Sequence, residues 1–320
     1  MSSRRGGGAG GGRGGKYFAD MPREQQISRA LSRLLRHSAQ QEGLKLGKGG
    51  YAALVDVLNA RPVKGFKITL PELKNLIASN DKQRFSLILA SSLQEGSEKI
   101  ESEIPTSITE QLDSDDPADY LIRANQGHSI QVDNEGLLTA ITEEAGNVPE
   151  VCVHGTDEAA WEWILKGGGL RKFSRNHIHF AAGLPAGFKS VVQDGGDIGE
   201  KEAAPVISGM RKSSTVLIYV DLKKALGKGV KFFKSENGVI LTEGDGKGLL
   251  SYEFFKRVES RKKGGGVLMS DGELPEGVKV DVEAWEKEFA GRRQGGGRGG
   301  RGGRGRARVN DDSRDVLAGF

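Results

Sequence analysis

The sequence predicts an α+β fold with a helical first lobe and a second lobe rich in short strands. Residues 27–80 carry apolar side chains at helical spacing in three short segments, whereas residues 120–263 contain several short strand-like runs. These runs far outnumber the helices that could cross between parallel strands. A segregated sheet is therefore favoured over a doubly wound parallel one.

The first lobe, residues 20–90, begins with a predicted amphipathic helix. Apolar side chains recur at helical spacing from Ile27 to Leu35, as expected of a helix with one face on a core. Arg36 and His37 follow at its C-terminal end, where the helix dipole favours a cation. This pair either stabilises the dipole or takes part in chemistry, and the helix pattern alone does not decide between the two.

Two further helices and a strand complete the predicted first lobe. A second helix is expected near residues 54–58, and Thr69 followed by Glu72 has the pattern of a capping box that starts a third. The string RFSLIL at 84–89 has the composition of a strand. Three short helices followed by a strand indicate a winged-helix-like lobe.

A polar segment separates the two predicted lobes. Residues 91–119 are rich in serine, glutamate and aspartate, and Pro105 and Pro117 disfavour regular structure. We expect this acidic segment to be a linker or a surface insertion. The second lobe, residues 120–263, carries another expected insertion at 189–204, where glycine and acidic residues dominate.

The second lobe is expected to hold short strands around one strong helix. The predicted strands are LIRA at 121–124, SIQV at 129–132, VCVH at 151–154, TVLIYVD at 215–221 and VILT at 239–242. The Asn237-Gly238 pair predicts a tight hairpin turn before the last of them. The segment EAAWEWILK at 158–166, followed by three glycines, predicts the helix.

Both ends of the chain are predicted to be disordered, because arginine and glycine alternate there without apolar residues to bury. These ends are a tail at 1–19 and the RGG-type tract of a C-terminal extension, residues 264–320. Within these ends, residues 1–15 carry three arginines and residues 292–308 carry seven, with no lysine or acid, so a net charge of +4 for the chain leaves −6 for the rest. Such tails bind RNA loosely and in a salt-sensitive way, unless they serve only to solubilise the chain.

Composition and motif content exclude several classes of protein. A single cysteine, Cys152, excludes an intramolecular disulfide framework and a CxxC metal site. No GxGxxG string follows a strand, which argues against a Rossmann dinucleotide site. No apolar run reaches bilayer-spanning length, and no apolar signal segment follows Arg4 and Arg5. We expect an intracellular protein, cytoplasmic, nuclear or both, with no membrane association.

All the histidines lie in short polar motifs rather than in apolar stripes. They are His37 in LLRHS, His128 in QGHS, His154 in VHGT, and His177 and His179 in SRNHIH. A side chain that exchanges protons near neutral pH, set among arginines and other donors, suits a site that handles phosphate. Strand-like alternation of SRNHIH would place its two histidines on one face, opposite Ile178.

Further polar strings also indicate a site that handles phosphate. Arg84 opens the predicted strand of the first lobe, and Gln126 lies in RANQGHS, a turn with a dense cluster of donors. Gly155 ends a buried strand and would let a ligand approach the backbone. Arg175 and Arg211 add cations in SRNHIH and VISGMR. Each string alone fits a salt bridge or a structural turn, but together they predict a phosphate-rich site.

Taken in order, the strings LSRLLRHS, NDKQRFSL, RANQGHS, VHGT, SRNHIH, VISGMR and NGVILT closely resemble the tRNA 2′-phosphotransferase family over roughly residues 27–260. The resemblance implies an N-terminal winged-helix lobe, a C-terminal lobe of the ADP-ribosyltransferase kind, and an active site between them. It also implies NAD-dependent removal of the splice-junction 2′-phosphate from ligated tRNA. In the family this passes through a 2′-phospho-ADP-ribosyl RNA and yields 2′-OH tRNA, nicotinamide and ADP-ribose 1″,2″-cyclic phosphate.

The resemblance implies a role for each residue at a matching position. The family's catalytic set falls on Arg36, His37, Arg84 and Arg175. The NAD-binding positions are His154, Gly155, Thr156, Asn176, His179 and Arg211, and His179 is preferred to His177. Gln126, His128 and Ser129 are expected to contact RNA or phosphate. NAD would be consumed as a co-substrate, and no metal would be needed.

Two alternative functions stay open beside this prediction. The first is an ADP-ribosyltransferase that modifies nucleic-acid phosphate ends or protein and stops there. The second is a non-catalytic RGG-type RNA-binding protein. The complete set of motifs favours the phosphotransferase, with 2′-phosphorylated tRNA and NAD as partners and with tails that add non-specific RNA binding.

Overall fold

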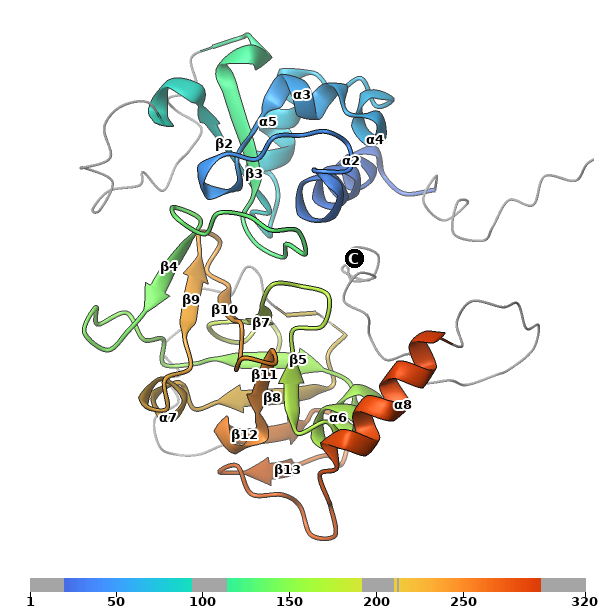
Figure 1. Cartoon of the computed structure of the whole chain (residues 1–320), viewed down its shortest axis with the longest axis vertical. Coiled ribbons are helices and arrows are strands. Elements are labelled where there is room, and N and C mark those ends of the chain that lie inside the picture. The colour runs from blue at the N-terminus through green and yellow to red at the C-terminus, as the bar shows by residue number, and fades with distance from the viewer. Residues whose placement is uncertain (1–19, 94–113, 192–209, 212, 295–320) are drawn as a thin grey trace, which may run out of the picture.

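The computed structural model has two lobes, which lie one above the other in Figure 1. It describes residues 20–93, 114–191, 210–211 and 213–294. The predicted tail 1–19, the tract from residue 295 onward and most of the predicted insertions 91–119 and 189–204 lie outside the described residues. Both lobes combine helices with antiparallel sheets, which confirms the α+β class.

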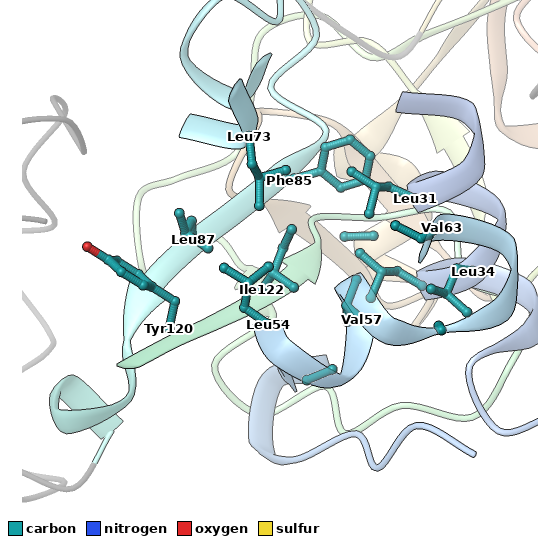
Figure 2. Packing of buried hydrophobic residues seen from close by; sticks show 14 of the residues in the cluster. Leu31, Leu34, Leu54, Val57, Val63, Leu73, Phe85, Leu87, Tyr120 and Ile122 are labelled. Carbon is teal, nitrogen blue, oxygen red and sulfur yellow. The ribbon is translucent and has the colours of Figure 1, made fainter. Parts of the chain in front are cut away.

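Helices and a small sheet form the first lobe. Its helices are α2 (Arg23–Arg33), which continues into a π-helical turn (Leu34–Ser38), α3 (Leu54–Asn59), α4 (Arg61–Lys64) and α5 (Leu70–Ala78). Its antiparallel sheet has the order β1-β3-β2, with β1 at Ala52–Ala53, β3 at Tyr120–Ala124 and β2 at Phe85–Leu89. Figure 2 shows side chains from both kinds of element in one core, among them Leu31, Val57 and Ile122.

The predicted cap of α5 is present. Thr69 Oγ1 accepts a hydrogen bond from the backbone N–H of Glu72 at 3.3 Å, which satisfies one of the unpaired donors of the first turn. The Glu72 carboxylate pairs with Arg23 of α2, with 2.7 Å between Nε and Oε1. The cap therefore also ties the two helices together.

Strand β3 corrects the predicted boundary between the lobes at residue 120. The sequence placed LIRA in the second lobe, but Tyr120, Ile122 and Ala124 are buried in the core of the first. Strand β3 pairs with β2 from Phe85↔Ala124 to Leu89↔Tyr120. Strand β2 alone would leave its backbone groups unpaired, so it pairs with the strand that follows the acidic segment.

The predicted strand SIQV at 129–132 is absent, and the segment is an irregular loop. Its backbone groups bond to residues outside any ladder. The N–H of Ser129 donates to the carbonyl of Arg36 at 3.0 Å, and the carbonyl of Ile130 accepts from the side chain of Asn176 at 2.9 Å. The segment therefore bonds to both lobes instead of joining a strand ladder.

Two four-stranded antiparallel sheets share the core of the second lobe. One has the order β4-β9-β10-β7, formed by Leu138–Ile141, Phe232–Ser235, Ile240–Thr242 and Ile178–Phe180. The other has the order β13-β12-β8-β5, formed by Val267–Ser270, Phe255–Ser260, Val216–Val220 and Val153–Thr156. Phe180, Ile218 and Phe232 belong to the shared core. Strand β6 (Gly169–Arg171) pairs with β11 (Leu249–Ser251), and α7 spans Leu222–Gly227.

The predicted helix and hairpin of the second lobe are both confirmed. Helix α6 (Glu158–Lys166) is capped by Asp157, whose Oδ1 accepts from the N–H of Ala160 at 2.8 Å. Gly238 has a φ of 78° in the β9–β10 turn, and its N–H donates to the carbonyl of Ser235 at 2.9 Å. A left-handed residue of this kind is what a tight hairpin turn requires.

The second lobe continues past the predicted limit at residue 263. Strand β13 pairs with β12, and helix α8 (Val282–Gln294) lies beside α6 in Figure 1. The buried ring of Trp285 covers Gly167 at the end of α6, where an added Cβ would lie 2.9 Å from the indole. Among the described residues, the structure has no helix that combines the length and apolar character needed to cross a bilayer.

Candidate active site

A loop at residues 125–130 joins the segments that carry the predicted catalytic residues. The N–H of Ser129 donates to the carbonyl of Arg36, and the N–H of Asn125 donates to the carbonyl of Arg84, each at 3.0 Å. The carbonyl of His128 accepts from the N–H of Asn176 at 2.9 Å, which fixes the turn that contains Arg175. Three arginine-bearing segments, two from the first lobe and one from the second, therefore meet at this loop.

Arg36 lies in the π-helical turn that ends α2, an irregularity that is common at functional sites. The side chain is 9% exposed and lies against Gly127, where an added Cβ would be 3.5 Å from the guanidinium carbon. Within the described residues Arg36 forms no ion pair, and its buried Nε and Nη2 have no hydrogen-bond partner. Burial, followed by the charges of Arg175 and Arg84, lowers the pKa of Arg36 to about 9. The guanidinium is therefore still charged at neutral pH, and no carboxylate among the described residues pairs with it.

His37 is the half-buried neighbour of Arg36. Its Nδ1 is 2.8 Å from Oγ of Ser129, while its buried Nε2 has no hydrogen-bond partner among the described residues. Burial and then the charges of Arg36 and Arg175 lower the pKa of His37 to about 4. The ring is therefore neutral at pH 7. Because the serine hydroxyl can either donate or accept, it keeps its bond while the ring gains or loses a proton at Nε2.

Arg84 lies at the entry to β2 and is held partly by Asn80, whose Oδ1 accepts from Nη1 at 3.2 Å. Burial, followed by the charge of Arg29, lowers the pKa of Arg84. Arg29 on α2 is 4% exposed, and no motif in the sequence indicates it. Arginine is rarely buried to this extent, but the helical pattern assigns no special meaning to a polar residue beside an apolar face.

Arg175 and Asn176 lie in the loop before β7. The N–H of Arg175 donates to the carbonyl of Lys172 at 3.0 Å and closes the turn. The charge of Arg175 lowers the pKa values of Arg36, His37 and His179, so it acts on both lobes. Asn176 uses its backbone N–H and its side-chain amide to bind the 125–130 loop rather than standing free for a ligand.

Three further histidines surround this cluster in their neutral form. Burial and then Arg36 lower the pKa of His128 to about 3, and burial and then Arg175 hold the pKa of His179 well below its usual range. Burial also lowers the pKa of His177, which lies 3.7 Å from the Glu243 carboxylate. Ile178 is in the core, so the histidines on either side of it face away from the core, as predicted.

The VHGT string forms β5, next to the cluster. His154 Nδ1 is 2.9 Å from the carbonyl of His179, and because a carbonyl only accepts, this nitrogen carries the proton. The position of Gly155 differs from the prediction of open backbone, because an added Cβ would lie 2.5 Å from Met210 and 2.6 Å from Ser214. Its small size therefore accommodates the side chains of Met210 and Ser214. Thr156 is buried, with its carbonyl bound to the N–H of Thr215.

Two predicted site residues have weaker links to the cluster. Gln126 is half-buried in the 125–130 loop, and its side chain forms no hydrogen bond within the described residues. Arg211 lies in the segment that covers β5, where its carbonyl accepts from the N–H of Ser214 at 3.2 Å. Ligand roles for both stay predictions.

The described part of the chain suits an anion better than a metal ion. Its residues include no group of three or more His, Cys, Asp or Glu side chains able to hold a metal ion. Buried ring nitrogens of His37, His128 and His179 and buried donors of Arg36 have no hydrogen-bond partner there. A phosphate group offers several acceptor oxygens and would compensate buried cations. The arrangement can bind a phosphoryl group and move a proton beside it.

Comparisons with known proteins agree with this chemistry. A family model described as RNA 2′-phosphotransferase, Tpt1 / KptA family, matches residues 22–244. The chain is 38% identical over 260 residues to a putative tRNA 2′-phosphotransferase of Schizosaccharomyces pombe, covering 81% of this chain but 54% of that relative. It is 35% identical over 240 residues to tRNA 2′-phosphotransferase 1 of Danio rerio (75% of this chain, 87% of the relative) and 37% identical over 242 residues to that of Homo sapiens (74% and 78%). The chain therefore belongs to the RNA 2′-phosphotransferase family, Tpt1 / KptA.

Proposed function

We propose that this protein removes the 2′-phosphate that ligation leaves at a tRNA splice junction, with NAD as co-substrate. The observation that carries the proposal is the convergence of Arg36, Arg84 and Arg175 on one loop beside a neutral His37. The charges of Arg175 and Arg84 lower the pKa of Arg36, and such like charges stay together when an anion neutralises them in the working state. A phosphate on RNA is such an anion.

The arginines would bind and stabilise the phosphoryl group. A planar guanidinium offers paired donors to phosphate oxygens, and preorganised cations stabilise charge that builds up during transfer. Arg36 presents buried donors. Arg84 lies just before β2 of the first lobe, and Arg175 lies in the loop before β7 of the second lobe. Binding between the lobes would hold the phosphate against all three.

His37 would exchange the proton. Its neutral ring keeps Ser129 as partner at Nδ1 and leaves Nε2 for a hydroxyl group of the RNA or of the ribose. A bound phosphate would raise the pKa of the ring toward neutrality, because an anion nearby favours the charged imidazolium. The same group can then act as base and as acid in successive steps.

The residues present fit an NAD site. Both buried ring nitrogens of His179 lack a hydrogen-bond partner among the described residues, and the Nδ1 proton of His154 is fixed by a backbone carbonyl. We propose that His154, Thr156 and His179 hold the dinucleotide, with Asn176 and Arg211 near it and Gly155 making room for the covering segment. Bound NAD would supply an ADP-ribosyl group for transfer to the phosphate, with nicotinamide as the leaving group. His128, Ser129 and Gln126 would line the phosphate side.

The lobes would divide the work between RNA and NAD. The helices and small sheet of the first lobe would form the winged-helix-like unit, and the paired sheets of the second would form the ADP-ribosyltransferase-like unit. Relatives named tRNA 2′-phosphotransferase support tRNA as the partner. RNA binding by the arginine–glycine tracts belongs to residues outside the described ranges.

The test uses a short RNA with one internal 2′-phosphate, incubated with the purified full chain with and without NAD. We expect NAD-dependent conversion to 2′-OH RNA and ADP-ribose cyclic phosphate, resolved by chromatography. RNA or protein that keeps a stable ADP-ribose group would favour the transferase alternative. RNA binding without any reaction would favour the RGG-type binding protein.

A further inference from the structure

The tip of the β9–β10 hairpin, residues Glu236 and Asn237, reaches from the second lobe to the first. Figure 1 shows this hairpin directed toward the lower end of β3. Asn237 is 7% exposed, and its Nδ2 donates to the carbonyl of Lys82 at 3.0 Å. Its Oδ1 accepts from the hydroxyl of Ser235 at 2.8 Å. One amide therefore ties the hairpin to a turn of the other lobe.

The Glu236 carboxylate forms a second bridge between the lobes. Its Oε2 is 2.8 Å from Nη2 of Arg123 on β3 and 2.7 Å from Oγ of Ser86 on β2. The side chains of Arg123 and Glu236 are 7% and 22% exposed, so solvent and salt screen this pair little. Arg123 also donates to the carbonyls of Gly49 and Gly136. The tip is thus anchored in a buried polar network, where bonds reinforce one another.

Both bridges lead to the turn at residues 82–84. Asn237 binds the first carbonyl of this turn directly. The hydroxyl of Ser86 is shared between Glu236 and Oδ1 of Asn125, which lies 2.6 Å away. Asn125 donates from Nδ2 to the carbonyl of Gln83 at 2.8 Å and from its N–H to the next carbonyl at 3.0 Å. Groups outside the turn therefore bind three successive carbonyls.

This turn needs such support because its backbone is strained. Gln83 has a φ of 41°, a left-handed conformation that costs a residue with a side chain about 1–2 kcal/mol. A strained backbone persists only where its surroundings determine it. Arg84 is the next residue, so relaxation at Gln83 would move the guanidinium relative to the phosphate site.

We propose that Glu236 and Asn237 are positioning residues for Arg84, which places control of one catalytic arginine in the opposite lobe. The inference rests on the proposed function, because it assigns these two residues a part in the same reaction. It predicts that the hairpin acts only through Arg84. Neither residue touches the phosphate or NAD in this assignment.

The experiment is a double-mutant cycle with Asn237→Ala and Arg84→Ala, followed as single turnovers of 2′-phosphorylated RNA by excess full-length enzyme. In the wild-type background we expect Asn237→Ala to slow dephosphorylation about tenfold, as the loss of one buried hydrogen bond implies. In the Arg84→Ala background we expect less than about a twofold change, because the group that it positions is already gone.

Two further variants separate positioning from folding. Lys234→Ala, at an exposed site on the same hairpin, should keep the wild-type rate. Asn237→Ser keeps a polar side chain at the turn but is too short to reach the Lys82 carbonyl, so it should repeat the tenfold loss if Asn237→Ala fails to fold. Wild-type rates for the Asn237 variants, or equal losses in both backgrounds, would overturn the inference. Failure of the wild-type enzyme on this RNA would instead overturn the proposed function.

Discussion

The turns that carry Arg84 and Arg175 share a feature and differ in what supports it. Each has a left-handed residue other than glycine: Gln83, directly before Arg84, has a φ of 41°, and Phe173, two residues before Arg175, has a φ of 50°. The Arg84 turn is bound by hydrogen bonds from the 125–130 loop and the β9–β10 hairpin. The Arg175 turn is also bound to the 125–130 loop, through Asn176, and its Phe173 side chain, which is 40% exposed, adds contacts with aromatic rings of α8, with 5.5 Å between the ring centroids of Phe173 and Phe289.

This difference determines what each arginine is sensitive to. A hydrogen bond depends on the position and direction of two atoms, whereas ring packing depends mainly on buried area. The position of Arg84 therefore depends on how the lobes meet. The position of Arg175 depends in addition on α8, which follows the family-matched residues 22–244.

The largest expected effect is the loss of either arginine itself. Arg84→Ala and Arg175→Ala should each slow dephosphorylation about 10²–10³-fold, because each removes a cation that stabilises charge in the transition state. We expect RNA that carries ADP-ribose to accumulate, since charge builds up in the second step. Single-turnover chromatography measures both quantities. Arg61→Ala, at a side chain that is 82% exposed, is the matched control and should react like the wild type; full turnover by either active-site variant would contradict the assignment.

The next largest effect is on the stability of the protein, and it tests the support that α8 gives to the Arg175 turn. Trp285 is 5% exposed, stacks on Phe289 at 4.9 Å and lies 4.6 Å from the guanidinium carbon of Arg171. Trp285→Ala should lower the free energy of unfolding by about 3 kcal/mol, as truncation of a buried aromatic ring implies. Urea unfolding measures the change, with exposed Lys287→Ala as the control. A loss below about 1 kcal/mol would mean that α8 packs only loosely on this lobe.

Local signals in the sequence predicted much of the fold and indicated residues of the candidate site. Periodicity predicted α2 and α6, the cap residue Thr69 predicted the start of α5, and Asn237-Gly238 predicted the hairpin turn. The ordered strings also named arginines and histidines that the structure brings together. Such features depend on residues close in the chain, where propensity and spacing carry the information.

Contacts between distant residues could not be predicted in this way. Asn237 and Lys82 are 155 positions apart, and nothing in either string indicates the other. The pairing of β3 with β2 was missed because strand patterns do not state a partner. The strained turns could not be predicted, because the left-handed residues Gln83 and Phe173 are not types that favour that conformation.

The pH dependence of the free energy of unfolding should report on the 125–130 loop, which binds both the Arg84 turn and the Arg175 turn. Burial and the charge of Arg36 lower the pKa of His128 from 6.5 to about 3. As pH falls below about 6.5 the unfolded chain takes up the proton first, so stability is complete above that pH and is lost toward about 3. Between about pH 6.5 and 5, the free energy of unfolding should fall by about 2 kcal/mol from this cause.

His128→Gln should remove that part of the pH dependence. Urea unfolding of the wild type and the variant at several pH values compares the slopes, so an overall loss of stability from the substitution does not affect the reading. Gln126→Ala, in the same loop, should keep the wild-type slope. Equal slopes for His128→Gln and the wild type would show that His128 already titrates normally in the folded protein.

The smallest expected effect is a change in stability on substitution by glycine, and its sign should differ between the two turns. Glycine relieves a left-handed conformation worth about 1–2 kcal/mol but adds about 0.5–1 kcal/mol of chain entropy to the unfolded state. Gln83 is exposed, so Gln83→Gly should be neutral or stabilise by up to about 1 kcal/mol. Phe173→Gly gains the same relief but loses ring contacts worth about 0.5–1.5 kcal/mol each, together with buried apolar area, so it should destabilise by about 1 kcal/mol or more. Thermal unfolding of both variants decides the matter, because shifts of the same sign would mean that ring packing and hydrogen bonding support the turns alike.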